Sequence, residues 1–188
     1  MNREEWLEKA TSVMNVLFVP DYDVGDVRVS VGFPSHRALS NKRRAIGQCW
    51  GGKVAEDGVP HIFISPLLKS RKEVLETLLH EMAHAAVGTE CGHKGEFVKC
   101  IRYLGLEGKP TSTVAGEELA ERLRKIGDGL GDYPHSALVP AMLEKKKQGT
   151  RLLKVMCVEC DFIGRFSRRA LDEIGYPVCP CGREMEDA

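Results

Sequence analysis

The sequence predicts an α+β fold in which a small antiparallel sheet packs on one long helix, with a separate small module at the C-terminal end. Three observations predict this fold. Strand-like alternation comes before residue 66, a helical pattern occupies residues 70–88, and four of the seven cysteines lie in two close pairs after residue 156. We therefore expect a core over residues 1–127, a linker with a short helix over residues 128–150, and a cysteine module over residues 151–188.

The composition is that of a globular protein, with 43% hydrophobic and 29% charged residues. The 27 basic and 27 acidic residues cancel, so the net charge gives no argument for a nucleic-acid or membrane partner. The first twelve residues lack the apolar region of a secretory signal, and no apolar run approaches the ~20 residues that span a bilayer. We expect a cytoplasmic protein with no membrane partner.

One helix and three strands are predicted before the long helix. Residues 3–18 carry apolar side chains at helical spacing, and a proline follows them as a stop. Period-2 alternation of valines over residues 27–31 predicts the first strand, and residues 45–53 and 61–65 have the pattern of two more. Cys49 and His61 are assigned to these strands as sheet residues.

A basic stretch lies between the first two predicted strands. It contains His36, Arg37, Lys42, Arg43 and Arg44. We interpret this stretch as a solvated loop in preference to a nucleic-acid contact.

The long helix is predicted by its ends and by its apolar stripe. Ser70 and Glu73 fit an S-x-x-E capping box, and Gly88 stands where a C-terminal stop is expected. An apolar stripe along the helix predicts that one side is buried. Its members are Val74, Leu75, Leu78, Leu79, Met82 and Ala86.

This helix carries the motif His80-Glu81-Met82-Ala83-His84, an H-E-x-x-H pattern. Positions i and i+4 of a helix project from the same face, so His80 and His84 can bind one metal ion. Glu81 is adjacent to that face and can act as general base toward a water molecule. The motif on a capped amphipathic helix favours a catalytic zinc site over two surface histidines.

A catalytic zinc commonly takes three protein ligands, so a third ligand is expected. His93 is the first candidate, because it lies at the start of a second short amphipathic helix after a glycine-rich reversal. Glu96 and His135 are its competitors. The pattern H-E-x-x-H-x-x-G-x-x-H is excluded, because the chain has Val87 and Glu90 at the positions that require glycine and histidine.

The segments IGQCW, HIFISP, HEMAHA and GHKGEF resemble those of the SprT-like zinc metallopeptidase family. The resemblance covers about residues 1–110 and implies a zincin-like core, zinc on His80, His84 and His93, and a catalytic Glu81. It also implies a substrate that is protein bound or crosslinked to DNA. The chain departs from the family pattern at Lys94, where glycine is usual, although a glycine follows immediately.

The region after the motifs carries fewer signals. Residues 113–126 predict a helix that Gly127 and the following glycine-rich residues break. Tyr133 and His135 fall in the irregular stretch and are candidates to stabilise an oxyanion in the cleft. A short helix over residues 139–148 is predicted as the linker to the last module.

The last module contains Cys157 and Cys160 in one pair and Cys179 and Cys181 in a second. Four thiolates at this spacing predict a tetrahedral structural zinc, and the flanking strands resemble a zinc ribbon. The module is too small to bury an adequate core, so the metal is expected to supply its folding energy. SprT-like proteins often end in such a ribbon.

A basic strip runs through the linker and this module and is a candidate for non-specific nucleic-acid contacts, with a solubilising surface as the alternative. The strip consists of Lys145, Lys146, Lys147, Arg151, Lys154, Arg165, Arg168 and Arg169.

The expected function is that of a zinc metalloendopeptidase with one catalytic and one structural zinc, acting on proteins that are associated with or crosslinked to DNA. The alternative is a non-catalytic adaptor for DNA or protein in which the histidine-bound zinc is structural. Glu81 favours catalysis, because a structural site needs no carboxylate beside its first histidine.

Overall fold

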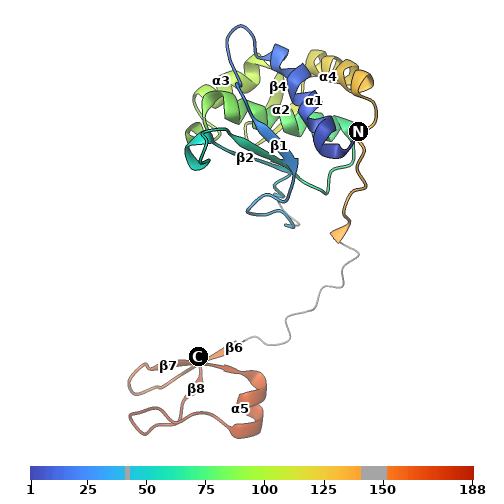
Figure 1. Cartoon of the computed structure of the whole chain (residues 1–188). Helices are drawn as coiled ribbons and strands as arrows, with labels where there is room; N and C mark the ends of the chain where they lie inside the picture. Colours follow the sequence, from blue (N-terminus) through green and yellow to red (C-terminus); the bar gives the residue numbers. More distant parts are fainter. Residues whose placement is uncertain (41–42, 141–151) are drawn as a thin grey trace. The chain divides into compact units, whose positions relative to one another are not determined.

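The computed structural model describes residues 1–40, 43–140 and 152–188. The chain divides into two compact units, Met1–Pro140 and Ala141–Ala188. Within the described residues it is a mixed α/β protein with five α-helices and three small sheets, compatible with the predicted α+β class (Figure 1). Among those residues no helix combines the length and the apolar character that crossing a membrane requires.

The first unit is built around a three-stranded sheet with the order β1-β3-β2. Its strands are β1 (Arg28–Val31), β2 (Gly47–Trp50) and β3 (His61–Ile64). β2 pairs antiparallel with β3, as predicted, but β1 pairs parallel with β3, so the prediction of a fully antiparallel sheet is wrong. The chain passes from β1 to the far edge of the sheet before it returns to the centre, and a period-2 pattern carries no information on that order.

Helix α1 (Arg3–Met14) and helix α2 (Arg71–Val87) contribute most of the helical side of the core. α1 begins with a capping box in which Asn2 and Glu5 exchange side-chain to backbone hydrogen bonds of 2.8 and 3.0 Å. The cluster of buried side chains joins these helices to one face of the sheet. Its fully buried members include Trp6, Leu7, Met14, Ile62, Ile64, Leu78 and Met82.

The ends of α2 differ in part from the prediction. Ser70 is the N-cap residue, but its side chain makes no capping hydrogen bond, so the predicted capping box with Glu73 is absent. The C-terminal stop is confirmed, because Gly88 ends the helix with a φ of 84°. Packing of the apolar stripe, in which Val74, Leu78 and Leu79 are fully buried, therefore stabilises α2 without a side-chain cap.

The segment after the short helix α3 (Glu96–Tyr103) differs from the prediction. β4 (Leu106–Lys109) and β5 (Ser112–Ala115) form an antiparallel hairpin, so residues 113–115 are strand and not helix. Helix α4 begins at Glu117 and continues through Gly127 to Leu130.

The continuation of α4 through Gly127 has a packing reason. A β-carbon at Gly127 would lie 2.8 Å from Nε of Arg71, so the missing side chain lets α4 approach α2 closely. Arg71 also donates a hydrogen bond of 3.0 Å to the Gly127 carbonyl oxygen. This tertiary contact outweighs the low helix propensity of glycine, on which the predicted break rested.

Over residues 152–188, the part of the second unit that the structure describes, there are a three-stranded antiparallel sheet with the order β7-β6-β8 and one helix. The elements are β6 (Leu152–Met156), β7 (Ile163–Ser167), α5 (Arg168–Ile174) and β8 (Glu186–Asp187). Its core is small, and Val155, Leu171 and Met185 are the buried side chains beside two cysteines. The helix predicted over residues 139–148 lies mostly outside the described residues.

Candidate metal centres

Three imidazole rings meet beside α2. His80 and His84 project from one face of α2, and His93 lies between the short 3-10 helix η3 (Thr89–Cys91) and α3. The Nε2 atom of His93 is 3.4 Å from the Nε2 atoms of both His80 and His84. A tetrahedral ion with metal–nitrogen bonds of about 2.0–2.1 Å, as zinc has, places its nitrogen ligands about 3.3 Å apart. The three histidines therefore fit a single metal ion.

The chain reverses direction to bring His93 back to α2. Gly92 and Gly95 on either side of it have φ values of 51° and 54°, in the left-handed region that favours glycine. Gly95 therefore supplies a left-handed turn directly after Lys94, the position where the sequence departs from the family pattern. The sharp turns hold the imidazole of His93 over the open side of the His80–His84 pair.

The other candidates for third ligand are engaged elsewhere. Glu96 accepts a hydrogen bond of 2.7 Å from Nζ of Lys99. Nε2 of His135 lies 2.9 Å from the carbonyl oxygen of Pro66, and its Nδ1 lies 3.3 Å from a guanidinium nitrogen of Arg3. Among the described residues, the histidine group, whose possible ligand atoms all lie within 4.8 Å of one another, consists of His80, His84 and His93 and includes neither Glu96 nor His135.

Burial keeps these histidines in the form that binds metal. It lowers the pKa of His80 to about 4, with a further contribution from His93, and the pKa of His84 to about 3, with contributions from His80 and His93. Burial also lowers the pKa of His93. The imidazoles are neutral at pH 7, and neutral imidazole is the form that donates a lone pair to a metal.

Two residues that the sequence did not single out as part of this site hold the rings in place. Oγ1 of Thr113 on β5 lies 2.9 Å from Nδ1 of His80, so the opposite ring nitrogen faces the other histidines. The ring of Phe97 on α3 stacks on His84 with centroids 3.9 Å apart and also contacts His80 and His93. Phe97 stands in the GHKGEF segment, whereas nothing near Thr113 in the sequence points to the site.

Glu81 lies beside this group and outside it. Its side chain is 7% exposed, and burial raises its pKa to about 8, partly offset by a backbone hydrogen bond from Cys49. A β-carbon at Gly47 would lie 2.6 Å from Oε1 of Glu81, so the carboxyl group rests directly against β2. Because Glu81 is not one of the clustered ligands, it is free to act as an acid or a base.

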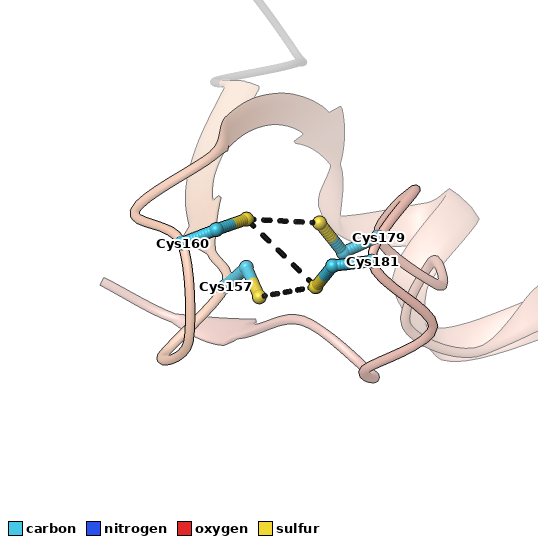
Figure 2. A group of neighbouring side chains, drawn as sticks. All are labelled: Cys157, Cys160, Cys179 and Cys181. Atoms are coloured by element: carbon cyan, nitrogen blue, oxygen red, sulfur yellow. Dashed lines mark hydrogen bonds between the residues drawn. The ribbon is translucent and has the colours of Figure 1, made fainter.

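The four cysteines of the second unit form the other candidate centre. Figure 2 shows their sulfur atoms turned toward one another, with Sγ–Sγ distances of 3.4 Å for Cys157–Cys181 and Cys160–Cys179 and 3.8 Å for Cys160–Cys181. Four thiolates around a zinc ion at about 2.3 Å lie about 3.8 Å apart. Backbone hydrogen bonds, the first from Glu159, lower the pKa of Cys157 to about 7. The cluster can hold a metal ion.

Turns on both sides of this cluster bring the sulfur atoms together. The backbone N–H of Asp161 donates to the carbonyl oxygen of Cys157, and the N–H of Gly182 donates to that of Cys179. Gly182 has a φ of 89°, which closes the second turn although only one residue separates its two cysteines. The short C-x-C spacing is therefore accommodated.

Tyr133 and His135, the candidates for oxyanion stabilisation, are not brought to the three histidines. Tyr133 is buried, and its ring packs edge-on against Trp6 with centroids 5.1 Å apart. His135 lies against Pro66 and Arg3, before the start of α2. The structure places both residues in the packing of α1.

The basic strip is described only in part, because Lys145, Lys146, Lys147 and Arg151 lie outside the described residues. Lys154 and Arg165 are exposed and face each other across β6 and β7. Arg168 is exposed as well, and Arg169 forms an ion pair with Glu173 at 2.8 Å.

Comparisons with protein-family models, with curated proteins and with solved structures give no match to this chain. The site itself therefore carries the functional argument. Within the described residues, the fold and its side chains define a mixed α/β protein with two groups, three histidines and four cysteines, that could each hold a metal ion.

Proposed function

We propose that the chain is a zinc-dependent metallopeptidase of the SprT-like type, with a zincin-like core and a zinc ribbon. One observation carries the proposal. Three Nε2 atoms converge at distances that suit one tetrahedral ion, while the buried carboxyl group of Glu81 lies beside them without joining them. Three protein ligands leave a fourth position open, which distinguishes a catalytic zinc from a closed structural one.

The chemistry divides between the ion and Glu81. Zinc held by three imidazoles acidifies a water molecule and polarises a carbonyl group. Glu81 accepts the proton of the attacking water on its carboxylate and delivers it to the amine that leaves. Its low exposure suits this role, because a carboxyl group with a raised pKa is able both to take and to give a proton near neutral pH.

A polypeptide substrate is supported by the position of β2. β2 is an edge strand, so no other strand of the described sheet pairs with its outer side. The backbone of Cys49 in this strand hydrogen-bonds to Glu81, and Gly47 touches the same carboxyl group. An extended peptide that pairs with this edge passes beside the general base and the three histidines.

The cysteine cluster is proposed to hold the second zinc, with a structural role. Its unit buries only a few apolar side chains, so metal binding supplies much of its folding free energy. The exposed Lys154, Arg165 and Arg168 support contact with DNA, which agrees with the DNA-associated protein substrates that the family resemblance implies.

The experiment that tests the function is cleavage of a DNA-bound protein and of casein by the full chain, with and without DNA. The matched control is Glu81→Gln, which keeps the shape of the side chain and removes the base. We expect cleavage by the original protein and its loss in Glu81→Gln, with two zinc ions per chain in both. A zinc-loaded protein that cleaves neither substrate would favour the non-catalytic adaptor.

A further inference from the structure

The face of the three-stranded sheet that is turned away from α2 has an unusual set of side chains. Strand alternation sends Ile62 and Ile64 into the core, which turns His61 and Phe63 outward. In β2, Gly47 and Cys49 face the core, so Trp50 points to the outer face. Trp50 is 40% exposed, and a large aromatic side chain in that position is not explained by packing of the core.

These side chains lie in register and line a hollow. Trp50 is paired with His61, and His61 is paired with Arg28, so the three form one row across the sheet. Phe63 lies one row further along. Together with the connection between β2 and β3, they surround an open hollow of about 590 Å³. The hollow is large enough to hold the planar ring of a nucleobase.

One wall of the hollow is fixed by an ion pair. Arg28 donates from both terminal nitrogens to the carboxylate of Asp57, one of them at 3.0 Å, and lies 3.3 Å from Nε2 of His61. The pair holds a planar guanidinium beside the aromatic rings and neutralises the charge of Asp57. The edge of a nucleobase is recognised by hydrogen-bond donors in a fixed plane, and its face is recognised by an aromatic stacking surface. The hollow combines both features.

The chain between β1 and β2 carries a concentrated positive charge and is attached to the same face at one point. Residues 32–46 contain Arg37, Lys42, Arg43 and Arg44 and no acidic residue. Ser35 anchors this segment to the outward-facing side chain of Gln48, with hydrogen bonds of 2.7 and 3.0 Å. Three of these cations, Arg37, Arg43 and Arg44, belong to the described residues, and they outnumber Glu56, the carboxylate that lines the hollow beside the Arg28–Asp57 ion pair.

The basic segment has features of a functional loop. Arg37, Arg43 and Arg44 are exposed, and among the described residues none of the three is in an ion pair with a carboxylate. Arg37 has a φ of 53°, a left-handed conformation that is costly for a residue with a side chain. Arginines without a carboxylate partner, together with the exposed ring of Trp50 and the half-buried rings of His61 and Phe63, match the composition of a single-strand binding surface.

We propose that this outer sheet face, with Trp50, His61, Phe63 and the arginines Arg37, Arg43 and Arg44 of the basic segment, binds single-stranded nucleic acid. Bases stack on the aromatic row, and phosphates contact the arginines of the segment. This site belongs to the first unit, whereas the basic ribbon belongs to the second, and its existence does not depend on peptidase activity.

The two tryptophans of the chain give a direct measurement. Trp6 is fully buried and Trp50 is exposed, so a base that stacks on the surface quenches the fluorescence of Trp50 alone. We expect a single-stranded oligothymidine of twelve nucleotides to quench the tryptophan fluorescence of the full chain. In Trp50→Leu the quenching disappears, and binding measured by anisotropy of the labelled oligomer weakens at least about five-fold. Unchanged anisotropy in Trp50→Leu would refute the stacking surface.

A matched pair of charge variants separates this site from the ribbon. Arg37→Ser/Arg44→Ser and Arg165→Ser/Arg168→Ser remove two cations each from exposed positions. We expect the first variant to weaken binding and to lower the slope of log affinity against log salt by about 1.4, since each phosphate contact on a single strand contributes about 0.7. Loss of binding in the ribbon variant alone would overturn the proposal, as would equal binding of the oligomer annealed to its complement.

Discussion

The hydroxyl group of Thr113 lies 2.9 Å from Nδ1 of His80, on the side of the ring opposite to the other two histidines. A hydrogen bond at Nδ1 decides which ring nitrogen keeps its lone pair, so a strand residue sets the metal-binding form of a helix residue. A second contact supports the first, because Glu76 accepts a hydrogen bond of 3.2 Å from the backbone N–H of Ala115. Residues four apart on α2 thus meet residues two apart on β5.

Thr113→Val should weaken zinc binding at the histidine site by about 10- to 100-fold, because the ring of His80 loses the partner that orients it. Competition with a chromogenic chelator measures this affinity, and the cysteine site of the same chain is the internal reference. Thr113→Ser keeps the hydroxyl group and should bind zinc like the original protein. Equal affinities in the valine and serine variants would contradict the positioning role.

Gly47→Ala should abolish peptidase activity while zinc content stays at two ions per chain. The new β-carbon would lie 2.6 Å from Oε1 of Glu81 and 2.6 Å from Cγ2 of Thr77, so the carboxyl group must move away from β2. Gly129→Ala is the matched control, because its β-carbon would meet no atom within 4 Å. Full activity in Gly47→Ala would show that the position of Glu81 is not critical.

Cys160→Ser should reduce the zinc content from two ions to one and make residues 152–188 sensitive to protease, while residues 1–140 stay protected. The described core of the unit is small, so we expect its folding to depend on a metal bound to the four cysteines. Mass spectrometry of the protease-resistant fragment gives the boundary. Cys91→Ser serves as the control, since Cys91 belongs to neither ligand group and its contact with the Val87 carbonyl is one that a hydroxyl group reproduces.

Cys49 and Cys100 should resist alkylation by iodoacetamide at pH 8. Burial raises the pKa of each thiol to about 12, with a further contribution from Glu81 at Cys49, so the reactive thiolate is scarce at that pH. Because the cause is burial, both should react in urea. Peptide mapping after alkylation measures the two states, and rapid modification of Cys49 in the native protein would contradict the burial of its thiol.

The candidate metal ligands on α2 and in the cysteine module were the most predictable part of the site. His80 and His84 are one helical turn apart, and Cys157 and Cys160 lie in one short turn, so local spacing alone brings each pair together. His93 required one further inference, that the glycines around it reverse the chain. These predictions use information within a few residues of the motif.

The remaining parts depend on contacts between distant segments. Thr113 reaches His80 only because β4 and β5 form a hairpin against α2, and the sequence near it has the pattern of a helix. The same holds for α4, whose passage through Gly127 depends on Arg71, a residue far away in the sequence. The parallel pairing of β1 with β3 depends on strand order, which local alternation does not encode.

The short turn between β4 and β5 carries a constraint of its own. The register of the hairpin pairs Lys109 with Ser112, and Thr113 follows directly on the face that reaches His80. Side chains of a strand alternate, so inserting one residue in this turn would aim Ser112 or Val114 at the imidazole instead. A change of one residue in the length of this turn is therefore expected to break the contact between Thr113 and His80, although the turn itself lies outside the candidate metal site.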